Sequence, residues 1–115
     1  MPRRALRNDW ARNQPATLLD EARRAQTTAT MALYGLMDDM DALLTPSAPG
    51  EAPEGLHWTG DPAFNALWTL LHGPNITIPA GTGPKGLPLG VQLVGRPGED
   101  RAVLGWARWL QGALG

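Results

Sequence analysis

The chain has 115 residues, of which 43% are hydrophobic and 18% charged, a composition typical of one globular domain and not of a disordered tail. Its formal net charge is −1, so the chain does not have the excess of Lys and Arg that nucleic-acid binding requires. The absence of cysteine excludes disulfide frameworks, thiol nucleophiles and cysteine-based zinc sites.

Residues 1–16 carry Arg3, Arg4, Arg7 and Arg12 but show no sustained hydrophobic period, and Pro2 and Pro15 interrupt them. We expect an irregular, solvated Arg-rich arm here. An organelle transit peptide is the alternative, whereas a secretory signal would need an apolar region that is missing. No stretch of the chain approaches the roughly 20 apolar residues of a membrane helix, so we expect no membrane contact and a cytoplasmic location.

The next segment predicts an amphipathic helix over residues 17–38. Thr17 is a candidate N-cap, followed by two acidic residues in the first turn, where they suit the positive end of the helix dipole. Apolar side chains recur at spacings of three and four and form one Ala-rich stripe. Its members are Leu18, Ala22, Ala25, Ala29, Ala32, Leu36 and Met40.

The remaining residues predict alternating strands and helices. Asp61 and Pro62 are typical of a helix start, and Gly73-Pro74 of its end, so a second helix is expected there, with Trp68 on its apolar face. The other predicted elements are a strand over 42–45, a loop over 46–60, strands over 75–79 and 87–95, and a helix over 99–111 that buries Val103, Trp106, Ala107 and Leu110. The fold class is therefore α/β, a small mixed sheet flanked by helices in the order α-β-α-β-β-α.

Residues Gly81, Gly83 and Gly86 match the spacing G-x-G-x-x-G after a predicted strand. A dinucleotide fingerprint must open a helix, but these glycines lead into a second strand, and Pro84 removes one amide from any phosphate cradle. We therefore expect a hairpin connection and no nucleotide cofactor.

Ser47, His57 and Asp61 could be drawn as a hydrolytic triad. Ser47, however, stands between two prolines without the strand–turn–helix context of a nucleophile elbow, so a structural serine is the better interpretation. The two histidines lack metal-ligand spacing, so we expect no metal site, and His72 is expected to cap the second helix.

The five tryptophans raise the question of a stacking surface for ligands. Trp68 and Trp106 fall on the apolar faces of predicted helices, where core packing is the better interpretation. Trp109 lies off the main stripe of the last helix and is a candidate for an exposed interface residue.

In order and spacing, the segments from Asp41 onward resemble the C-terminal portion of amidase-signature enzymes, the Ser-Ser-Lys amide hydrolases. The resemblance covers residues 17–112, and His72-Gly73-Pro74 departs from it because the family commonly has a glycine two residues before the proline. The matching stretches are Asp41–Pro46, Thr59–Asn65, Trp68–His72, Asn75–Pro79 and Gly86–Gly95.

This resemblance implies that the chain divides into the arm, residues 1–16, and an amidase-like C-terminal segment, residues 17–115. It implies that this segment has part of the family's α/β fold. It also implies a mechanism with a serine nucleophile, a second serine in a cis peptide bond and a lysine, all upstream of the matching portion. Ser47 is the only serine of the chain, and Lys85 lies on a predicted turn, so no catalytic residue is assigned. The resemblance places Asp61, Asn65 and Trp68 at a pocket-lining helix as candidate substrate-binding residues.

Two functions remain open at this point. The chain is either the C-terminal segment of an amide hydrolase that is inactive alone, or a non-catalytic module that docks a partner chain. In the first case its partner is a complementary N-terminal amidase segment or a second copy, since three strands are few for an independent core. A hydrolase using Ser47 and His57 is a third, weaker hypothesis.

Overall fold

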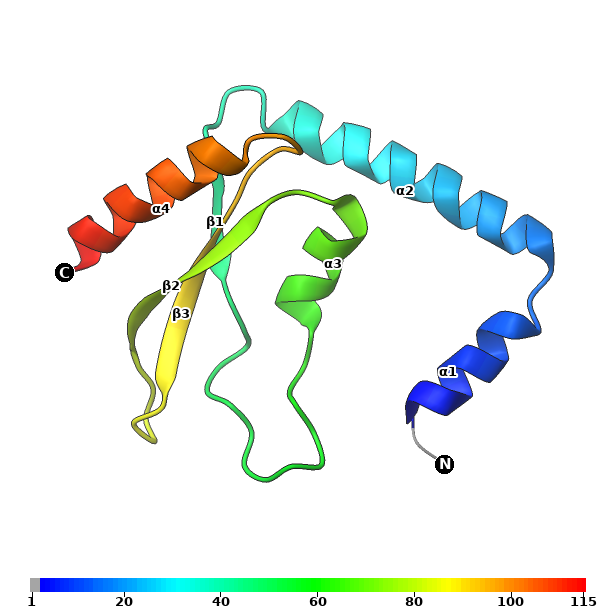
Figure 1. Cartoon of the computed structure of the whole chain (residues 1–115), viewed down its shortest axis with the longest axis horizontal. Coiled ribbons are helices and arrows are strands. Elements are labelled where there is room, and N and C mark those ends of the chain that lie inside the picture. The colour runs from blue at the N-terminus through cyan, green and yellow to red at the C-terminus, as the bar shows by residue number, and fades with distance from the viewer. Residues whose placement is uncertain (1–2) are drawn as a thin grey trace.

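The computed structural model describes residues 3–115. Within this range the chain forms four helices and three strands, and the predicted α-β-α-β-β-α order is confirmed with one additional helix in front (Figure 1). The elements are α1 Arg3–Arg12, α2 Ala16–Leu36, β1 Leu43–Pro46, α3 Ala63–Leu71, β2 Asn75–Thr82, β3 Pro88–Val94 and α4 Asp100–Leu114.

The three strands form one sheet in the order β1-β3-β2, and both pairs are antiparallel. Val94 pairs with Leu43 on one side and with Asn75 on the other, so β3 is the central strand. A mixed sheet was expected, but the pairing differs for a simple reason. A short hairpin joins β2 to β3 and makes them antiparallel, and β1 pairs with the opposite edge of β3, so the two strands that run parallel never touch.

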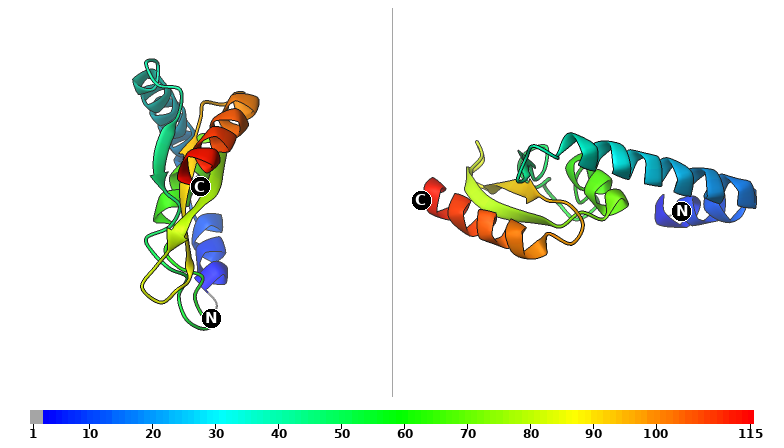
Figure 2. Two further views of the ribbon diagram at one scale, coloured as in Figure 1. Left: turned by 90° about the vertical axis from the view of Figure 1, so that its left-hand side faces the viewer. Right: turned by 90° about the horizontal axis from the view of Figure 1, so that it is seen from above.

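Helix α4 covers one face of the sheet and makes the core with it (Figure 2). Ile78, Leu93, Val103 and Ala107 are buried together there, as the strand alternation and the helix stripe predict. The prediction that Trp106 is buried is wrong, because 39% of this residue is exposed. Its ring packs edge-on against Trp109, with the ring centroids 6.2 Å apart. The sheet ends at β1, so no further strand is present in the described range for Trp106 to cover. The predicted exposure of Trp109 is confirmed at 65%.

The opposite face of the sheet carries α3 and the long loop that precedes it (Figure 2). Gln92 is the polar residue that ties these parts together, because its buried side-chain amide donates to the carbonyls of Pro46, at 3.2 Å, and Phe64, at 2.6 Å. A buried amide that satisfies two carbonyls fixes the end of β1 and the start of α3 against the central strand.

The N-terminal residues differ from the prediction. The segment expected to be irregular forms helix α1 from Arg3 to Arg12, although residues 1–2 of the predicted arm lie outside the described residues. No glycine or proline interrupts this stretch, and the side-chain amides of Asn13 and Gln14 donate to carbonyls of its last turn at 2.9 and 3.1 Å. Pro15 then separates α1 from α2.

Helix α2 begins at Ala16, and Thr17 is therefore not its N-cap, because Pro15 takes that position and no side chain caps the helix. None of the residues of α2 is buried, so the predicted Ala-rich stripe is not covered by the described part of the chain. The helix runs away from the sheet and contacts α3 with its second half (Figure 1).

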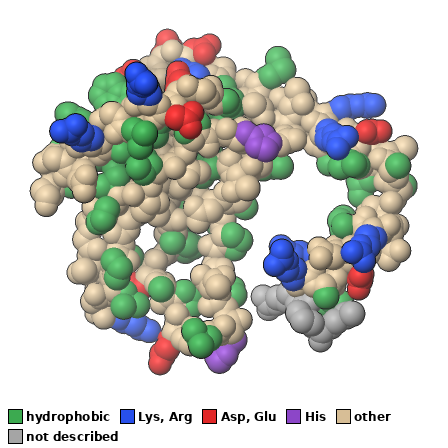
Figure 3. Space-filling view, viewed as in Figure 1, with side chains coloured by type: hydrophobic (Ala, Val, Ile, Leu, Met, Phe, Trp, Pro, Cys, Tyr) green, Lys and Arg blue, Asp and Glu red, His purple; other side chains and the backbone are tan. Residues whose placement is uncertain are grey.

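The described chain is flat and open. Its extents are 51 × 40 × 18 Å and its radius of gyration is 17.2 Å, against about 13 Å for a compact chain of this length. Its accessible surface of 8859 Å² compares with about 6,100 Å² for a folded monomer of 12.3 kDa. Hydrophobic side chains are visible across the surface in Figure 3. No helix of residues 3–115 combines the length and the hydropathy needed to cross a bilayer.

Candidate functional site

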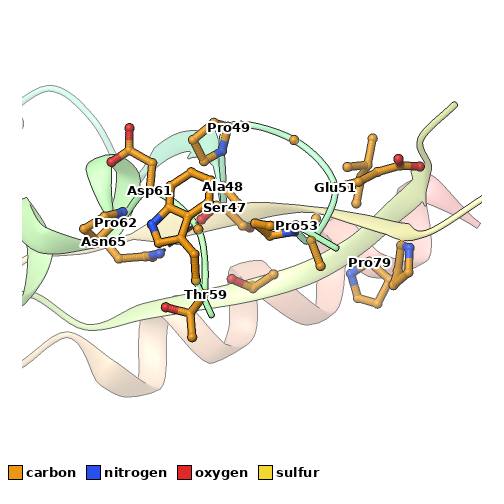
Figure 4. A pocket seen from close by; sticks show the side chains of 18 residues that line it. Ser47, Ala48, Pro49, Glu51, Pro53, Thr59, Asp61, Pro62, Asn65 and Pro79 are labelled. Carbon is orange, nitrogen blue, oxygen red and sulfur yellow. Dashed lines mark hydrogen bonds between the residues drawn. The ribbon is translucent and has the colours of Figure 1, made fainter. Parts of the chain in front are cut away.

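A cleft of about 830 Å³ lies between the 46–62 loop and the face of the sheet that α4 does not cover. The loop supplies most of its lining, and the strands β2 and β3 supply its floor through Thr77, Pro79 and Gly90. Gly90 is required at that floor, because a Cβ there would lie 2.6 Å from the Thr77 methyl group. In Figure 4, Asp61 and Asn65 lie at one end of the cleft, and Glu51 and Pro79 lie toward the other.

The first end of the cleft is built by the start of α3. The backbone N–H of Ala63 donates to the Asp61 carboxylate at 3.0 Å. Asp61 is nevertheless not the N-cap that the sequence predicted, because α3 begins one residue later than expected and Pro62 takes the cap position. The side-chain amide of Asn65 donates to the carbonyl of Ser47 at 3.3 Å and ties α3 to the loop beyond β1. Both residues line the cleft.

The other end of the cleft is fixed by Glu51. One oxygen of its carboxylate accepts from the backbone N–H groups of Lys85, at 2.8 Å, and Leu87, at 3.1 Å. These amides belong to the turn between β2 and β3, which confirms that the glycine-rich motif is a hairpin connection. Sequence reasoning missed Glu51, because no local pattern links it to a turn more than 30 residues away.

Trp68, the third candidate residue, does not line the cleft with Asp61 and Asn65. It lies on α3 and its side chain is buried, with 8% exposed. Trp58 lines the cleft and is 54% exposed. The five tryptophans were a signal in the sequence, but only the course of the loop identifies the one that borders the cleft.

The Ser47–His57–Asp61 grouping does not form a triad. Within residues 3–115, no hydrogen bond joins the His57 ring to either of the other two side chains, and the ring lies against Gly55 outside the cleft lining. The Ser47 hydroxyl is buried and has no hydrogen-bond partner among these residues. The hydroxyl therefore has no base to activate it in this arrangement.

His72 is the C-cap residue of α3, with its backbone in the left-handed region at φ 60°, but the carbonyl of Leu70 accepts from Gln26 and not from the His72 ring. Its Nε2 lies 3.0 Å from the side-chain amide of Gln26, which also donates to the carbonyl of Leu70 at 2.5 Å. Over the described range 3–115, no three His, Asp or Glu side chains group as metal ligands would.

The charges of the cleft are acidic. Glu51 and Asp61 are the charged residues that line it, and among the described lining residues there is no Lys, Arg or His. The remaining wall is largely apolar and includes Trp58, Leu89 and five prolines. The arrangement can hold a small molecule against an apolar wall beside two carboxylates, but its described lining contains no nucleophile with a base.

Comparison with known proteins identifies the group to which the chain is related. The family model described as Amidase matches residues 3–104. A glutamyl-tRNA(Gln) amidotransferase subunit of Cereibacter sphaeroides is 38% identical over 88 residues, which cover 68% of this chain and 18% of that protein. The same subunit of Nitrobacter winogradskyi is 35% identical over 104 residues, 80% of this chain and 21% of the relative.

The corresponding protein of Mesorhizobium japonicum is 38% identical over 87 residues, which cover 66% of this chain and 16% of that protein. The chain thus spans about a fifth of the length of these relatives. Because the family model covers α1 to the first turns of α4, and so includes the whole cleft, this chain belongs to the amidase family.

Proposed function

We propose that this chain forms one wall of the substrate cleft of an amidase-family hydrolase of carbon–nitrogen amide bonds. The observation that carries the proposal is the cleft itself, which the 46–62 loop, the start of α3 and the sheet build within the family-matching residues. Asp61 and Asn65 are its proposed substrate-binding residues. Trp68, which is buried, is proposed to support the helix that carries Asn65.

The 115 residues are proposed to be inactive by themselves. The Ser-Ser-Lys mechanism implied by the family resemblance needs two serines, whereas Ser47 is the only one here and its hydroxyl has no partner within residues 3–115. Lys85, the only lysine, lies in the hairpin turn and is not among the residues that line the cleft. The cleft therefore needs its nucleophile from another segment.

The proposed partner is a complementary N-terminal amidase segment. The chain exposes about 2,800 Å² more surface than a compact monomer of its mass, which exceeds the roughly 1,000–2,500 Å² that one partner contributes to an obligate interface. Exposed apolar side chains lie on every helix of the described chain. They include Leu6, Leu19, Met31, Leu67 and Leu104.

A chimera tests this function. In the Cereibacter sphaeroides relative, the matched C-terminal residues would be replaced by this chain, and amide hydrolysis would be measured for the chimera, for the relative lacking those residues and for this chain alone. We expect turnover only in the chimera, and loss of it when the nucleophilic serine of the relative's segment is replaced by alanine. An Asn65→Ala variant should lower kcat/KM by about tenfold, since the tie between α3 and Ser47 would be lost.

Two outcomes would contradict the proposal. Turnover by this chain alone that survives purification and is abolished by a Ser47→Ala substitution would show that the site is complete without a partner. A well-folded chimera without activity would instead favour the alternative function, a non-catalytic module that docks a partner through its exposed apolar surface. Thermal unfolding of the chimera and of the parent relative would establish that the chimera is folded.

A further inference from the structure

We propose that the cleft selects neutral or positively charged amides that carry a planar apolar group, and rejects amides that carry a carboxylate near the same group. This inference deepens the proposed function, because it names a substrate class for the cleft that the proposed function only locates. The charge of the cleft, its backbone amides that already bind carboxylates, its apolar wall and its rigidity each support the proposal.

The charge of the cleft is the first support. Glu51 and Asp61 both line it, and the described residues of its lining contribute no cationic side chain. Two carboxylates with no cationic side chain among the residues that line the cleft raise the local concentration of cations and repel anions, an effect that salt weakens. A substrate that brings a carboxylate of its own would therefore meet repulsion with no arginine or lysine of this wall to offset it.

The backbone amides that could bind an anion are the second support. The first N–H group of α3, at Ala63, already donates to the Asp61 carboxylate. The N–H groups of Lys85 and Leu87 at the hairpin turn already donate to the Glu51 carboxylate. Helix starts and turns of this kind are the usual backbone sites for anions, and here the amides of Ala63, Lys85 and Leu87 already bind the protein's own carboxylates.

The apolar wall is the third support. Trp58 presents a half-exposed ring to the cleft, and prolines from the loop and from the strands extend the apolar surface. A tryptophan face stacks on planar groups and attracts cations, whereas the desolvation of a carboxylate against this wall would be unfavourable. The wall therefore fits an aromatic or similarly flat group attached to an uncharged or cationic head.

The cleft is also held in shape without a ligand. Asn65 ties the loop to α3 at one end, and Glu51 ties it to the hairpin at the other. A loop anchored at both ends loses little conformational entropy when a small molecule binds. The selectivity should therefore be measurable on the 115-residue chain itself, before any partner segment is added.

Three probes that share a ring and a planar head group test the proposal, namely benzamide, benzamidinium and benzoate. Each would be titrated into the purified chain at low salt while NMR follows the Trp58 indole N–H and the Asn65 side-chain amide. We expect benzamidinium to bind at least as tightly as benzamide, and benzoate to bind about tenfold more weakly than benzamide. Benzoate binding as tightly as benzamide, or no binding of any probe at the cleft signals, would overturn the proposal.

Matched variants assign the selectivity to its residues. Asp61→Asn keeps an oxygen that can accept from Ala63 but removes the charge, and should reduce the preference for benzamidinium over benzamide by about threefold. Glu51→Gln tests the other carboxylate in the same way, and Asp39→Asn, at an exposed acid outside the cleft, should change nothing. An equal effect of Asp39→Asn would contradict the assignment. Because these titrations need no turnover, their outcome is independent of the chimera's activity.

Discussion

Two regions of the molecule are held in place by different forces. The body, defined as residues 43–114, contains the sheet, α3, α4 and the cleft, and it buries Ile78, Leu93, Val103 and Ala107 in one cluster. The second region consists of α1 and α2 and is called the arm from here on, although it extends well beyond the predicted arm of residues 1–16. None of the residues of α2 is buried. Apolar packing therefore holds the body together, whereas the apolar stripe of α2 remains in contact with solvent.

The arm is joined to the body mainly by hydrogen bonds to backbone carbonyls. Gln26 and Tyr34 of α2 donate to carbonyls at the end of α3. Arg96, after β3, donates to the carbonyls of Met37 and Met40 just beyond α2, and it also pairs with Glu99. The Met37 side chain is fully buried at this junction. The body is therefore stabilised by a core of its own. The apolar face of α2 is not buried by any part of the described chain, so the arm gains no comparable stabilisation.

Removing core volume from the body should have the largest effect. Ile78→Ala deletes side-chain atoms that are 4% exposed between the sheet and α4, and we expect a loss of about 2–5 kcal/mol in the free energy of unfolding. The measurement is chemical denaturation followed by tryptophan fluorescence. The matched control is Leu19→Ala on α2, where the side chain is 55% exposed and the expected change is within about 0.5 kcal/mol. Equal losses would mean that the arm shares the core of the body.

The junction should be the next most sensitive place. Arg96→Ala leaves two carbonyls beyond α2 without their donor, and we expect a loss of about 1–3 kcal/mol, with faster hydrogen exchange in the last turn of α2. Arg96→Lys should recover little, because an ammonium cannot reproduce the planar fork that reaches both carbonyls and Glu99. Arg101→Ala, at an exposed position of α4, is the control. An unchanged exchange rate in α2 would show that Arg96 does not hold the arm.

Tyr34 allows the same junction to be probed by pH. Burial raises the pKa of its phenol above the usual value, and the hydroxyl donates to the carbonyl of Leu71 at 3.1 Å. The stabilisation is complete below the unfolded-state pKa of about 10 and is lost as the pH rises toward the folded-state pKa. Tyr34→Phe should therefore cost about 1 kcal/mol at pH 8, and the difference from the parent should shrink above pH 10. A parallel decline of both proteins would contradict the assignment.

The sequence was informative where a local rule decides the structure. Hydrophobic alternation, the Asp61–Pro62 helix start and the glycine-rich turn identified the strands, α3 and the hairpin, because each depends on neighbours in the chain. The cleft depended on contacts between distant residues, such as Glu51 with the hairpin amides, which no local pattern encodes. Helix α1 was missed because four arginines gave no apolar period, although nothing in the segment opposes a helix.

A pair of glycines gives the smallest expected effects and the sharpest comparison of the two regions. Neither Gly35 in α2 nor Gly105 in α4 has any atom within 4 Å of an added Cβ, so alanine fits at both positions and favours the helix by about 0.5–1 kcal/mol. Gly105→Ala acts on a helix that packs in the core, so it should raise the midpoint of global unfolding. Gly35→Ala should slow hydrogen exchange within α2 and leave that midpoint unchanged, because the arm opens without the body. If both substitutions raise the midpoint equally, arm and body unfold as one unit and the distinction between them is wrong.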